Sequence, residues 1–527
     1  MSAAEAADAA APTPEDPHER ALLEAVAPAT WRAPTPRDRY NLVVIGGGPA
    51  GLVAAAGAAG LGATVALIER RRLGGDCLNY GCVPSKALLY SAHVAHAGGS
   101  GESTQEPETR GTSTDRSTRA TAPARGAPSA SALAAALHRA RRLRAQLAPH
   151  DSAARLAELG VDVFFGAARF VDAATVEVGG ARLAFARAMI ATGSAPAIPA
   201  LPGLADVGFL TTERVFELTA PPRRLTVLGG GAVGCELAQA FARLGCEVTL
   251  ITRGARLLPR EAAGASEVLG ARLTAEGVRC RLGAQALRVE RSGAGKALWY
   301  RWRDEDYAQD FDELLVATGR RPVIDGLGLD AAGVDADERG VRIDARLRTS
   351  NRRVFAIGDV TGRAGFTHAA DAMARLALRN ALFFGRERHD RLIIPRCTYT
   401  DPEIAQVGRT AEELRGEGLA FTTLTVPLAS VDRAVLEDDA AGFAEAHVDR
   451  RGRLLGVTVV ARRAGEVIGA AALAMTHGLR AGALSSTVVP YPTETEVLRK
   501  LGDAYARQRL TPGVRRWFTR MFAWRRR

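Results

Sequence analysis

The chain has 527 residues, too many for one ordinary domain, and its apolar content of 47% is enough for large packed cores. Six cysteines in this length are too few for a secreted disulfide scaffold, so a reducing, cytoplasmic compartment is expected. The net charge of +11 is carried mainly by arginine, since lysine occurs only three times, and no nucleic-acid-binding motif accompanies it. Nucleic acid is therefore not an expected partner.

The first 68 residues contain two contrasting segments. Residues 1–39 are rich in alanine, proline and acidic residues and are predicted to be disordered, and they lack the basic start and apolar run of a secretory signal. Residues 41–68 carry no charge and are long enough to span a bilayer. Because glycines interrupt this run in a strand–turn–helix–strand rhythm, we interpret it as a buried core and not as a membrane span.

Residues 98–131 are nearly free of large apolar side chains and are predicted to form a flexible surface insertion. The flanking stretches "KALLYSAHVAHA" and "ALAAALHRARRLRAQLA" are typical of helices. Further along the chain, strand-like runs such as "RLTVLGG" and "CEVTLIT" alternate with helical stretches. This alternation predicts an α/β architecture with parallel sheets.

The dinucleotide-binding fingerprint G-x-G-x-x-G occurs twice, each time between a strand and an Ala-rich helix. The two sets of glycines are Gly46, Gly48, Gly51 and Gly229, Gly231, Gly234. Such glycines permit a tight turn and close approach of the backbone to a pyrophosphate, which then lies at the helix N-terminus. Two complete copies predict two dinucleotide sites.

The residue that would contact the ribose distinguishes these two sites. Glu69 follows Gly46 by 23 residues, and its carboxylate suits the free ribose hydroxyls of FAD or NAD. At the same spacing from Gly229 the chain has Thr252, followed by Arg253. A 2′-phosphate is repelled by a carboxylate and attracted by an arginine, so the second site is expected to prefer NADPH, with NADH as the alternative. The alternative interpretation of Arg253 is an ordinary solvated loop arginine, so the argument depends mainly on the loss of the acid.

The stretch "GGDCLNYGCVPSK" contains two cysteines, Cys77 and Cys82, with four residues between them. The spacing alone is compatible with a structural disulfide, a pair of metal ligands or a redox couple. Cys82 immediately precedes a predicted helix, and Lys86 lies one turn further on. A helix N-terminus and a nearby cation both favour a thiolate, whereas a structural zinc site would need further ligands nearby.

Several motifs, in order, resemble the FAD-dependent pyridine nucleotide–disulfide oxidoreductases. The resemblance covers residues 40 to 500 apart from the insertion. Its motifs are "GGGPAG", "GGDCLNYGCVPSK", "ATGSAP", "GGGAVGCELAQAFARLG", "ATGRRP", "TSNRRVFAIGDV" and "TYTDPEIAQVG".

This resemblance implies two Rossmann-like domains, for FAD and NAD(P), followed by a C-terminal α+β dimerisation domain, and hence a homodimer. The implied boundaries are 40–195 with 315–390 for FAD, 196–314 for NAD(P)H, and 391–506 for dimerisation, leaving 507–527 as a tail.

The resemblance also implies roles for individual residues. Cys77 and Cys82 match the redox-active pair, with the second cysteine against the flavin and the first facing the substrate. Lys86 matches a lysine that pairs with a glutamate, here Glu236, near flavin N5. Asp359 matches the residue that binds the ribityl chain. Further cofactor contacts fall where the chain crosses between domains, at Thr192 and Gly193 for FAD and at Gly319 for NADPH.

The C-terminal motif departs from most of the family. Dihydrolipoamide dehydrogenase and glutathione reductase carry His-Pro-Thr-x-x-Glu, in which the histidine is an acid/base. This chain has "YPTETE", so Tyr491 replaces the histidine while Glu496 is retained. The resemblance implies that Tyr491 and Glu496 of the partner subunit complete the site. Because tyrosine titrates near 10, ordinary dithiol–disulfide exchange is not favoured.

Mercuric reductases carry tyrosine at this position, so a metal-ion reductase of that type is the first functional hypothesis. Two features depart from it: the chain ends "MFAWRRR" without a Cys-Cys pair, and no N-terminal Cys-x-x-Cys domain is present. Asp76 also stands where relatives have threonine, and a charged carboxylate there would raise a neighbouring thiol's pKa. The alternatives are an NADPH-dependent quinone or disulfide reductase and a slow, redox-sensing flavoprotein.

The remaining chemistry-bearing residues have no assigned role. The other thiols are expected in the core or on the surface, and His368 is expected to be structural; these thiols are Cys235, Cys246, Cys280 and Cys397. No resident metal site is predicted.

The tail 507–527 contains eight arginines, four large aromatic residues and no acid. Val514, Trp517, Phe518 and Met521 follow the spacing of one helix face. Residues 508–527 are therefore expected either to contact an anionic membrane peripherally or to pack on the dimer.

Overall fold

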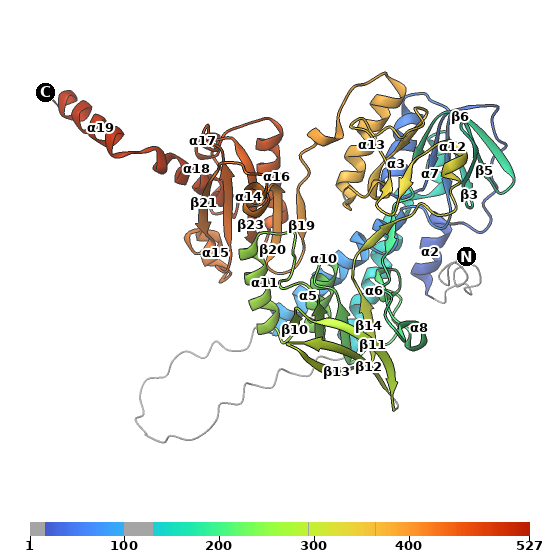
Figure 1. The fold of residues 1–527 in the computed structure, drawn as a ribbon, viewed down its shortest axis with the longest axis horizontal. Helices are drawn as coiled ribbons and strands as arrows, with labels where there is room; N and C mark the ends of the chain where they lie inside the picture. The colour runs from blue at the N-terminus through green and yellow to red at the C-terminus, as the bar shows by residue number, and fades with distance from the viewer. Residues whose placement is uncertain (1–15, 100–129, 294, 364, 527) are drawn as a thin grey trace.

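The computed structural model describes residues 16–99, 130–293, 295–363 and 365–526. It consists of three bodies, with the C-terminal body separated from the first one and the second lying between and below them (Figure 1). The predicted disorder of residues 1–15 and most of the predicted insertion, 100–129, lie outside the described residues.

The first body combines residues from the first third of the chain with a later segment. Its strands are β1 (Tyr40–Ile45), β2 (Val65–Glu69), β3 (Val161–Phe165), β4 (Arg169–Asp172), β5 (Thr175–Val178), β6 (Ala181–Ile190), β7 (Ser194–Pro196), β15 (Arg320–Pro322), β16 (Ala336–Asp337), β17 (Gly340–Val341) and β18 (Val354–Ala356). Its helices are α2 (Pro17–Val26), α3 (Pro49–Gly60), α4 (Gly75–Asn79), α5 (Cys82–Gly99), α6 (Ala130–Leu147), α7 (Ala153–Glu158), α12 (Leu329–Ala332) and α13 (Thr367–Leu382).

The main sheet of this body has the order β3-β2-β1-β6-β5-β4. Strand β18 also pairs with β6, on the side opposite to β1. Strands β3, β2, β1, β6 and β18 pair in parallel, and Val44 lies between Leu67 and Met189. The uncharged run that could have been taken for a membrane span supplies β1 and β2 at the centre of this sheet. Its continuous apolar character follows, because central parallel strands are buried on both faces.

The second body is another parallel nucleotide fold with an attached antiparallel sheet. The parallel sheet has the order β10-β9-β8-β14 and the attached sheet the order β11-β12-β13. The elements are α8 (Leu204–Val207), α9 (Thr212–Val215), β8 (Arg224–Leu228), α10 (Ala232–Arg243), β9 (Glu247–Thr252), α11 (Ala263–Ala275), β10 (Arg279–Leu282), β11 (Gln285–Ser292), β12 (Gly295–Trp302), β13 (Glu305–Phe311) and β14 (Glu313–Val316).

The third body is an antiparallel sheet of order β19-β20-β23-β22-β21 with helices packed against it. The elements are β19 (Arg396–Thr398), β20 (Glu403–Gly408), α14 (Ala411–Gly416), β21 (Thr422–Pro427), α15 (Asp432–Leu436), β22 (Phe443–Val448), β23 (Leu454–Ala461), α16 (Ala464–Thr476), α17 (Ala481–Ser486), α18 (Glu496–Arg509) and α19 (Pro512–Arg525). Helix α19 extends away from the rest of the chain (Figure 1).

The N-terminal segment is more ordered than its composition predicted. Disorder was expected throughout residues 1–39, yet α2 forms within that range and buries Leu22 and Val26 completely. The expectation is therefore wrong for residues 17–26. Leu22 and Val26 are four residues apart, so together they form one apolar stripe that overall composition does not reveal.

Two glycines of α3, Gly51 and Gly60, have very different surroundings, so replacing each by alanine should change the stability of the protein differently. A Cβ at Gly51 would lie 1.8 Å from the Gly46 carbonyl oxygen, so Gly51→Ala should lower the free energy of unfolding by about 1–3 kcal/mol. At Gly60, in the same helix, a Cβ would meet nothing within 4 Å, and Gly60→Ala should be neutral or slightly stabilising. Urea unfolding of the two flavin-free variants checks this, and equal midpoints would contradict it.

Candidate functional site

A single large cavity joins most of the residues that the motifs single out. Its volume is about 3690 Å³, and its walls come from all three bodies, including Glu236 of the second and Tyr399 of the third. Its lining includes Gly46, Glu69, Cys82, Lys86, Thr192 and Asp359.

The first glycine loop leaves room for an extended group such as FAD. Gly48 caps α3, and Gly46 adopts a φ of +107°, where a Cβ would collide with the Ala191 carbonyl oxygen. Glu69 faces the same loop, and its two carboxylate oxygens accept hydrogen bonds from the backbone N–H groups of Gly47 and Arg71, each at 2.6 Å. Burial raises the pKa of the Glu69 carboxyl. The close-packed backbone and oriented acid fit a dinucleotide with free ribose hydroxyls.

The second loop repeats this geometry without the acid. Gly231 caps α10, and Cβ atoms at Gly229 and Gly234 would lie 2.2 and 2.0 Å from backbone oxygens. Thr252 ends β9 at the position that Glu69 has in β2, and Arg253 follows it with an exposed side chain. The acid is therefore absent where the ribose would lie, and a guanidinium is accessible beside it.

Cys77 and Cys82 are brought together by the short helix α4 and the first turn of the longer helix α5. Cys77 lies in α4, and Cys82 is the first residue of α5, one position earlier than the helix that the sequence predicted. The Cys82 sulfur contacts the Thr367 hydroxyl at 3.3 Å. The hydrogen bond from the Cys77 thiol lowers the pKa of Cys82 to about 6, with help from Thr367 and the Lys86 charge, and the same hydrogen bond raises the pKa of Cys77. At neutral pH the reduced pair therefore consists of one thiolate and one thiol.

Lys86 and Glu236 form an ion pair across two bodies. The Lys86 ammonium lies 2.8 Å from Glu236 Oε2 and 4.4 Å from the centre of the Tyr399 ring. The other oxygen, Glu236 Oε1, accepts the backbone N–H of Tyr399 at 2.8 Å. Glu236 is only 5% exposed, so both of its oxygens need these partners. The sequence did not predict the contact between Tyr399 and Glu236, although Tyr399 lies in the family motif "TYTDPEIAQVG".

A polar chain connects the redox motif to Asp359. Asp76 lies 3.4 Å from Arg320, and Arg320 donates to the hydroxyl and the carbonyl of Ser194, each at 2.8 Å. The Ser194 hydroxyl in turn donates to Asp359 at 2.7 Å, and burial raises the pKa of Asp359. Sequence reasoning missed Ser194 and Arg320. Their position could have indicated this role, because both residues lie in the "ATG" segments where the chain crosses between domains, and these segments pair as β7 and β15.

Thr192, Gly193 and Gly319 lie in the same two crossings. Thr192 and Gly193 line the cavity, and the Thr192 hydroxyl donates to the Val323 carbonyl at 2.6 Å. Gly319 is outside the cavity lining, and its carbonyl accepts the N–H of Ala197 at 2.9 Å.

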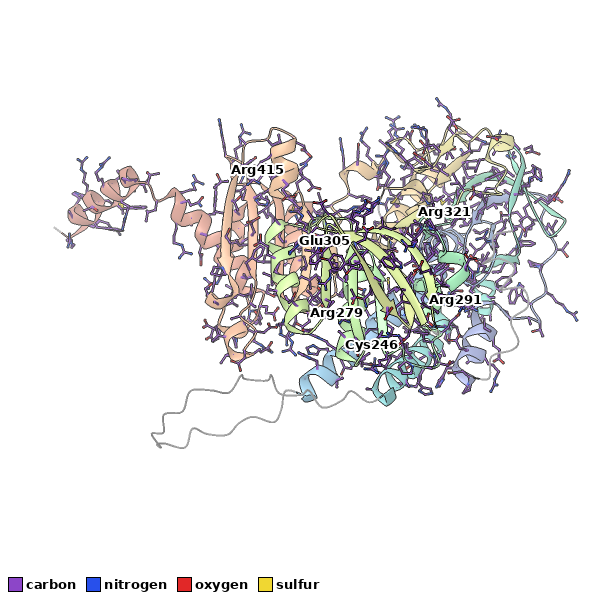
Figure 2. All side chains as sticks on the ribbon, turned by 60° about the horizontal axis from the view of Figure 1, so that its bottom comes forward. Cys246, Arg279, Arg291, Glu305, Arg321 and Arg415 are labelled. Atoms are coloured by element: carbon purple, nitrogen blue, oxygen red, sulfur yellow. The ribbon has the colours of Figure 1, made fainter. Side chains whose placement is uncertain are left out.

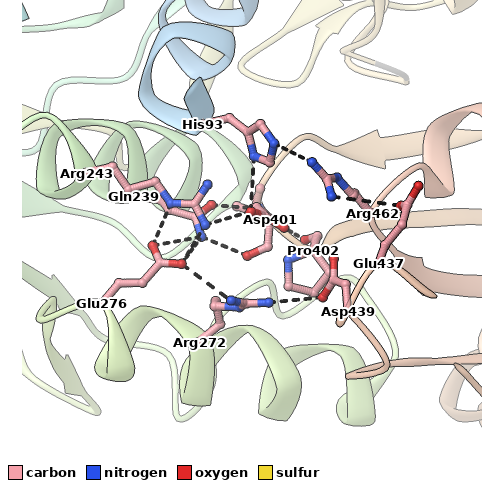
Figure 3. Close-up of polar contacts among 11 residues, drawn as sticks. His93, Gln239, Arg243, Arg272, Glu276, Asp401, Pro402, Glu437, Asp439 and Arg462 are labelled. Carbon is pink, nitrogen blue, oxygen red and sulfur yellow. Dashed lines mark hydrogen bonds and ion pairs between the residues drawn. The ribbon is translucent and has the colours of Figure 1, made fainter. Parts of the chain in front are cut away.

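A second polar network holds the third body against the first two (Figure 3). The Gln239 side-chain oxygen accepts the N–H of Asp401 at 2.7 Å, and its side-chain nitrogen donates to the Asp401 carbonyl at 2.8 Å. Arg243 bridges Asp401 and Glu276 at 2.7 and 2.6 Å, and His93 of α5 lies 3.4 Å from Asp401. Glu236, Gln239 and Arg243 occupy one face of α10, so this face positions the segment that contains Tyr399.

Tyr491 and Glu496 lie in the third body and do not line the cavity of their own chain among the described residues. Tyr491 is 71% exposed and donates its hydroxyl to Asp432 at 2.8 Å, which raises the pKa of the phenol. Glu496 is buried; Oε1 pairs with Arg499 at 2.7 Å, while Oε2 has no hydrogen-bond partner in the part of the chain that the structure describes. A tyrosine held in this way stays protonated near neutral pH.

The other thiols are dispersed. Cys246 lies in the second body (Figure 2), and its thiol donates to the Pro222 carbonyl at 3.0 Å, while Cys235 is fully buried. Cys397 lines the cavity but burial raises its pKa, and His368 contacts the Pro395 carbonyl at 2.6 Å. Among the described residues, no group of three or more His, Cys, Asp or Glu side chains is arranged to hold a metal ion.

Two dinucleotide loops and one pair of thiols define a flavin- and nicotinamide-dependent disulfide oxidoreductase. The profile described as "Pyridine nucleotide-disulphide oxidoreductase" matches residues 40–374, and that of its dimerisation domain matches residues 394–501. The chain belongs to this family. It is therefore an FAD-dependent oxidoreductase that uses NAD(P)H, and its dimerisation domain supports a homodimer.

Two curated relatives and one solved structure show which members of the family this chain is similar to. A mercuric reductase of Streptomyces lividans is 38% identical, over 88% of this chain and 96% of its own length. A dihydrolipoyl dehydrogenase of Thermus scotoductus is 35% identical, over 89% and 98%. Among solved structures, the Cu(II) complex of the HOCl-induced flavoprotein disulfide reductase RclA from Escherichia coli has a TM-score of 0.76 and 27% identity, covering 89% of this chain and 99% of that chain.

The charges around Cys82 generate a prediction for its reactivity. In the reduced protein, alkylation of Cys82 by iodoacetamide should rise with pH with a midpoint near pH 6, because only the thiolate reacts. Removing the cation in Lys86→Met should move this midpoint upwards. Removing the nearby carboxylate in Asp76→Asn should move it downwards, since the charge of Asp76 disfavours the thiolate.

Peptide mapping by mass spectrometry after timed alkylation gives the midpoint for each cysteine separately. Cys246, whose pKa burial raises to about 12, provides the internal reference and should react only at high pH. Shifts of the same sign in both variants would contradict an electrostatic origin.

Proposed function

We propose that this enzyme passes electrons from NADPH through the Cys77–Cys82 pair to a metal ion, as a reductase similar to mercuric reductase. The bound FAD would supply the redox chemistry that links hydride donation by the nicotinamide to reduction of the disulfide. The residues that would hold it are Glu69 at the ribose, Asp359 at the ribityl chain and Thr192 with Gly193 at the crossing. Lys86 and Glu236 would orient it where the two nucleotide sites meet.

The proposed role of the cysteines is based on their different protonation states. Cys82 carries the thiolate, and Cys77 carries the thiol that donates to it. Loss of one proton from Cys77 would give two thiolates that can bind a soft divalent ion together. The net reaction would be NADPH plus Hg²⁺ giving NADP⁺, H⁺ and Hg⁰, which balances in electrons and charge. This acceptor takes up no proton.

The observation that carries this choice of acceptor is the state of Tyr491. A disulfide or quinone acceptor needs protons on its products, and hence an acid/base at the site. Tyr491 donates to Asp432, and its pKa is raised, so it is a poor proton shuttle near neutral pH. Tyr491 and Glu496 of the partner subunit would complete the site. Reduction of a metal ion is the reaction least affected by the missing base.

A panel of acceptors tests this proposal. NADPH oxidation by the FAD-loaded protein should be fastest with Hg(II), followed by Cu(II), and slow with quinones, glutathione disulfide and lipoamide. Cys82→Ser should lower metal reduction at least about 100-fold, because the nucleophilic thiolate is lost. Cys246→Ser is the matched control and should retain full activity.

Strong lipoamide or glutathione reductase activity would overturn the choice of acceptor and favour the disulfide reductase alternative. Slow NADPH oxidation with every acceptor would favour a redox sensor instead.

The missing acid at Thr252 and the exposed Arg253 support a preference for NADPH over NADH. Arg253→Ala should raise the KM for NADPH about 10-fold, as expected for losing a charge-assisted hydrogen bond to phosphate, and leave the KM for NADH unchanged. Arg256→Ala is the control in the same loop, because Glu412 already pairs with Arg256 at 2.6 Å. Equal effects of Arg253→Ala on both nucleotides would contradict this preference.

The C-terminal helix supports a peripheral contact with an anionic membrane. None of the helices among the described residues is both long and apolar enough to cross a bilayer. Helix α19 buries no residue, and Trp517 and Trp524 are 60% and 73% exposed. Aromatic side chains with arginines and no acid suit the headgroup region of acidic lipids.

Liposome flotation tests this membrane contact. The full chain should float with vesicles that contain 30% phosphatidylserine at low salt, and less at 0.5 M salt because charge attraction is screened. Removal of residues 511–527, which leaves α18 intact, should abolish flotation. The control is a vesicle of phosphatidylcholine alone. Equal flotation with and without α19 would favour packing of the helix on the dimer.

A further inference from the structure

The segment 16–31 precedes the family profile, which begins at residue 40, yet it is built into the first body. Asp16 caps the N-terminus of helix α2, where its carboxylate accepts the backbone N–H of His18 at 2.8 Å. Leu22 and Val26 are fully buried in the same apolar cluster as strand β1. The helix is therefore part of the core of this domain.

Charged side chains attach α2 to α6. Glu19 receives two hydrogen bonds from Arg144, at 2.6 and 2.8 Å, and the Arg144 side chain is only 2% exposed. Asp16 pairs with Arg141 at 2.9 Å. A buried guanidinium is costly without its carboxylate, so the interaction holds α2 in one position.

The end of α2 is hydrogen-bonded to the backbone that carries the redox motif. The Val26 carbonyl accepts the N–H of Leu73 at 2.9 Å, and the next residue, Gly74, donates to the Gly47 carbonyl at 2.9 Å. Gly47 belongs to the first dinucleotide loop. A short series of backbone contacts therefore connects α2 with the loop and with the segment leading to Cys77.

After α2 the chain passes the end of the cavity where Glu69 lies. Trp31 donates its indole N–H to the Val163 carbonyl at 3.1 Å and packs edge-on against Phe165. Phe165 is the register neighbour of Glu69 in the sheet. The side of the cavity formed by this segment includes Leu23, Ala27, Pro28, Ala29 and Thr30.

We propose that residues 16–31 form a wall of the FAD site that covers its adenosine half. The ribose at Glu69 and the adenine beside it would be enclosed between this segment and the ends of β2 and β3. Enclosure removes apolar surface from water and restricts the exit of the dinucleotide, so the segment should increase the affinity for FAD.

The test compares the full chain with two truncations, in flavin-free protein titrated with FAD and with FMN. Removal of residues 1–31 should weaken FAD binding at least tenfold and leave FMN binding unchanged, because FMN lacks the adenosine. Removal of residues 1–15 is the control and should change neither constant. Quenching of flavin fluorescence gives both dissociation constants.

Point variants keep the test decisive if the longer truncation does not fold. Leu23→Ser, at the cavity wall, should weaken FAD binding several-fold and reduce the rise in Tm that FAD produces. Leu22→Ala, in the core, should lower Tm equally with and without FAD.

Two results would overturn the proposal. One is an equal loss of FAD and FMN affinity on removal of residues 1–31, which would mean that the segment supports folding only. The other is FAD binding by Leu23→Ser within twofold of the full chain.

Discussion

The buried carboxylate of Glu236 is the constraint on which the arrangement of the three bodies depends. One oxygen pairs with Lys86 of the first body, and the other accepts the N–H of Tyr399 in the third. Glu236 itself lies on α10, directly behind the second glycine loop. A carboxylate that is 5% exposed needs both interactions, so displacement of the first or the third body would leave one of its buried oxygens without a partner.

The same ion pair extends to the thiols. Lys86 follows Cys82 by four residues in α5, so one helix presents the thiolate and the ammonium on the same face. The Cys77 thiol, the Thr367 hydroxyl and the Lys86 charge favour the Cys82 thiolate, while burial and the charge of Asp76 oppose it. Arg320 lies 3.4 Å from Asp76 and connects that carboxylate through Ser194 to Asp359. The charge balance of the redox pair is therefore set by residues from separate parts of the chain.

Much of the fold could be predicted from local patterns. The glycine loops, the apolar strands and the helix beside Cys82 each follow from a few neighbouring residues, and the structure contains all of them, with the helix beginning one residue earlier than predicted. The disorder expected for residues 1–39 is wrong for α2, because the two-residue apolar stripe of Leu22 and Val26 is too short to stand out in an Ala- and Pro-rich segment. Helix α2 is stabilised by its contacts with α6 and β1, and these contacts are not visible in the sequence of residues 1–39 alone.

The sequence by itself determined the family, the two nucleotide folds, the paired cysteines and the tyrosine in place of histidine, because each is encoded within a short motif. The pairing of Lys86 with Glu236, which spans 150 residues, was already implied by the family resemblance. Tertiary structure alone decided two other hydrogen bonds between distant residues: the Tyr399 N–H with Glu236 across 163 residues, and Arg320 with Ser194 across 126. The physical reason is that a hydrogen bond requires a donor–acceptor separation of about 3 Å, and only the packing of whole domains brings such distant residues that close.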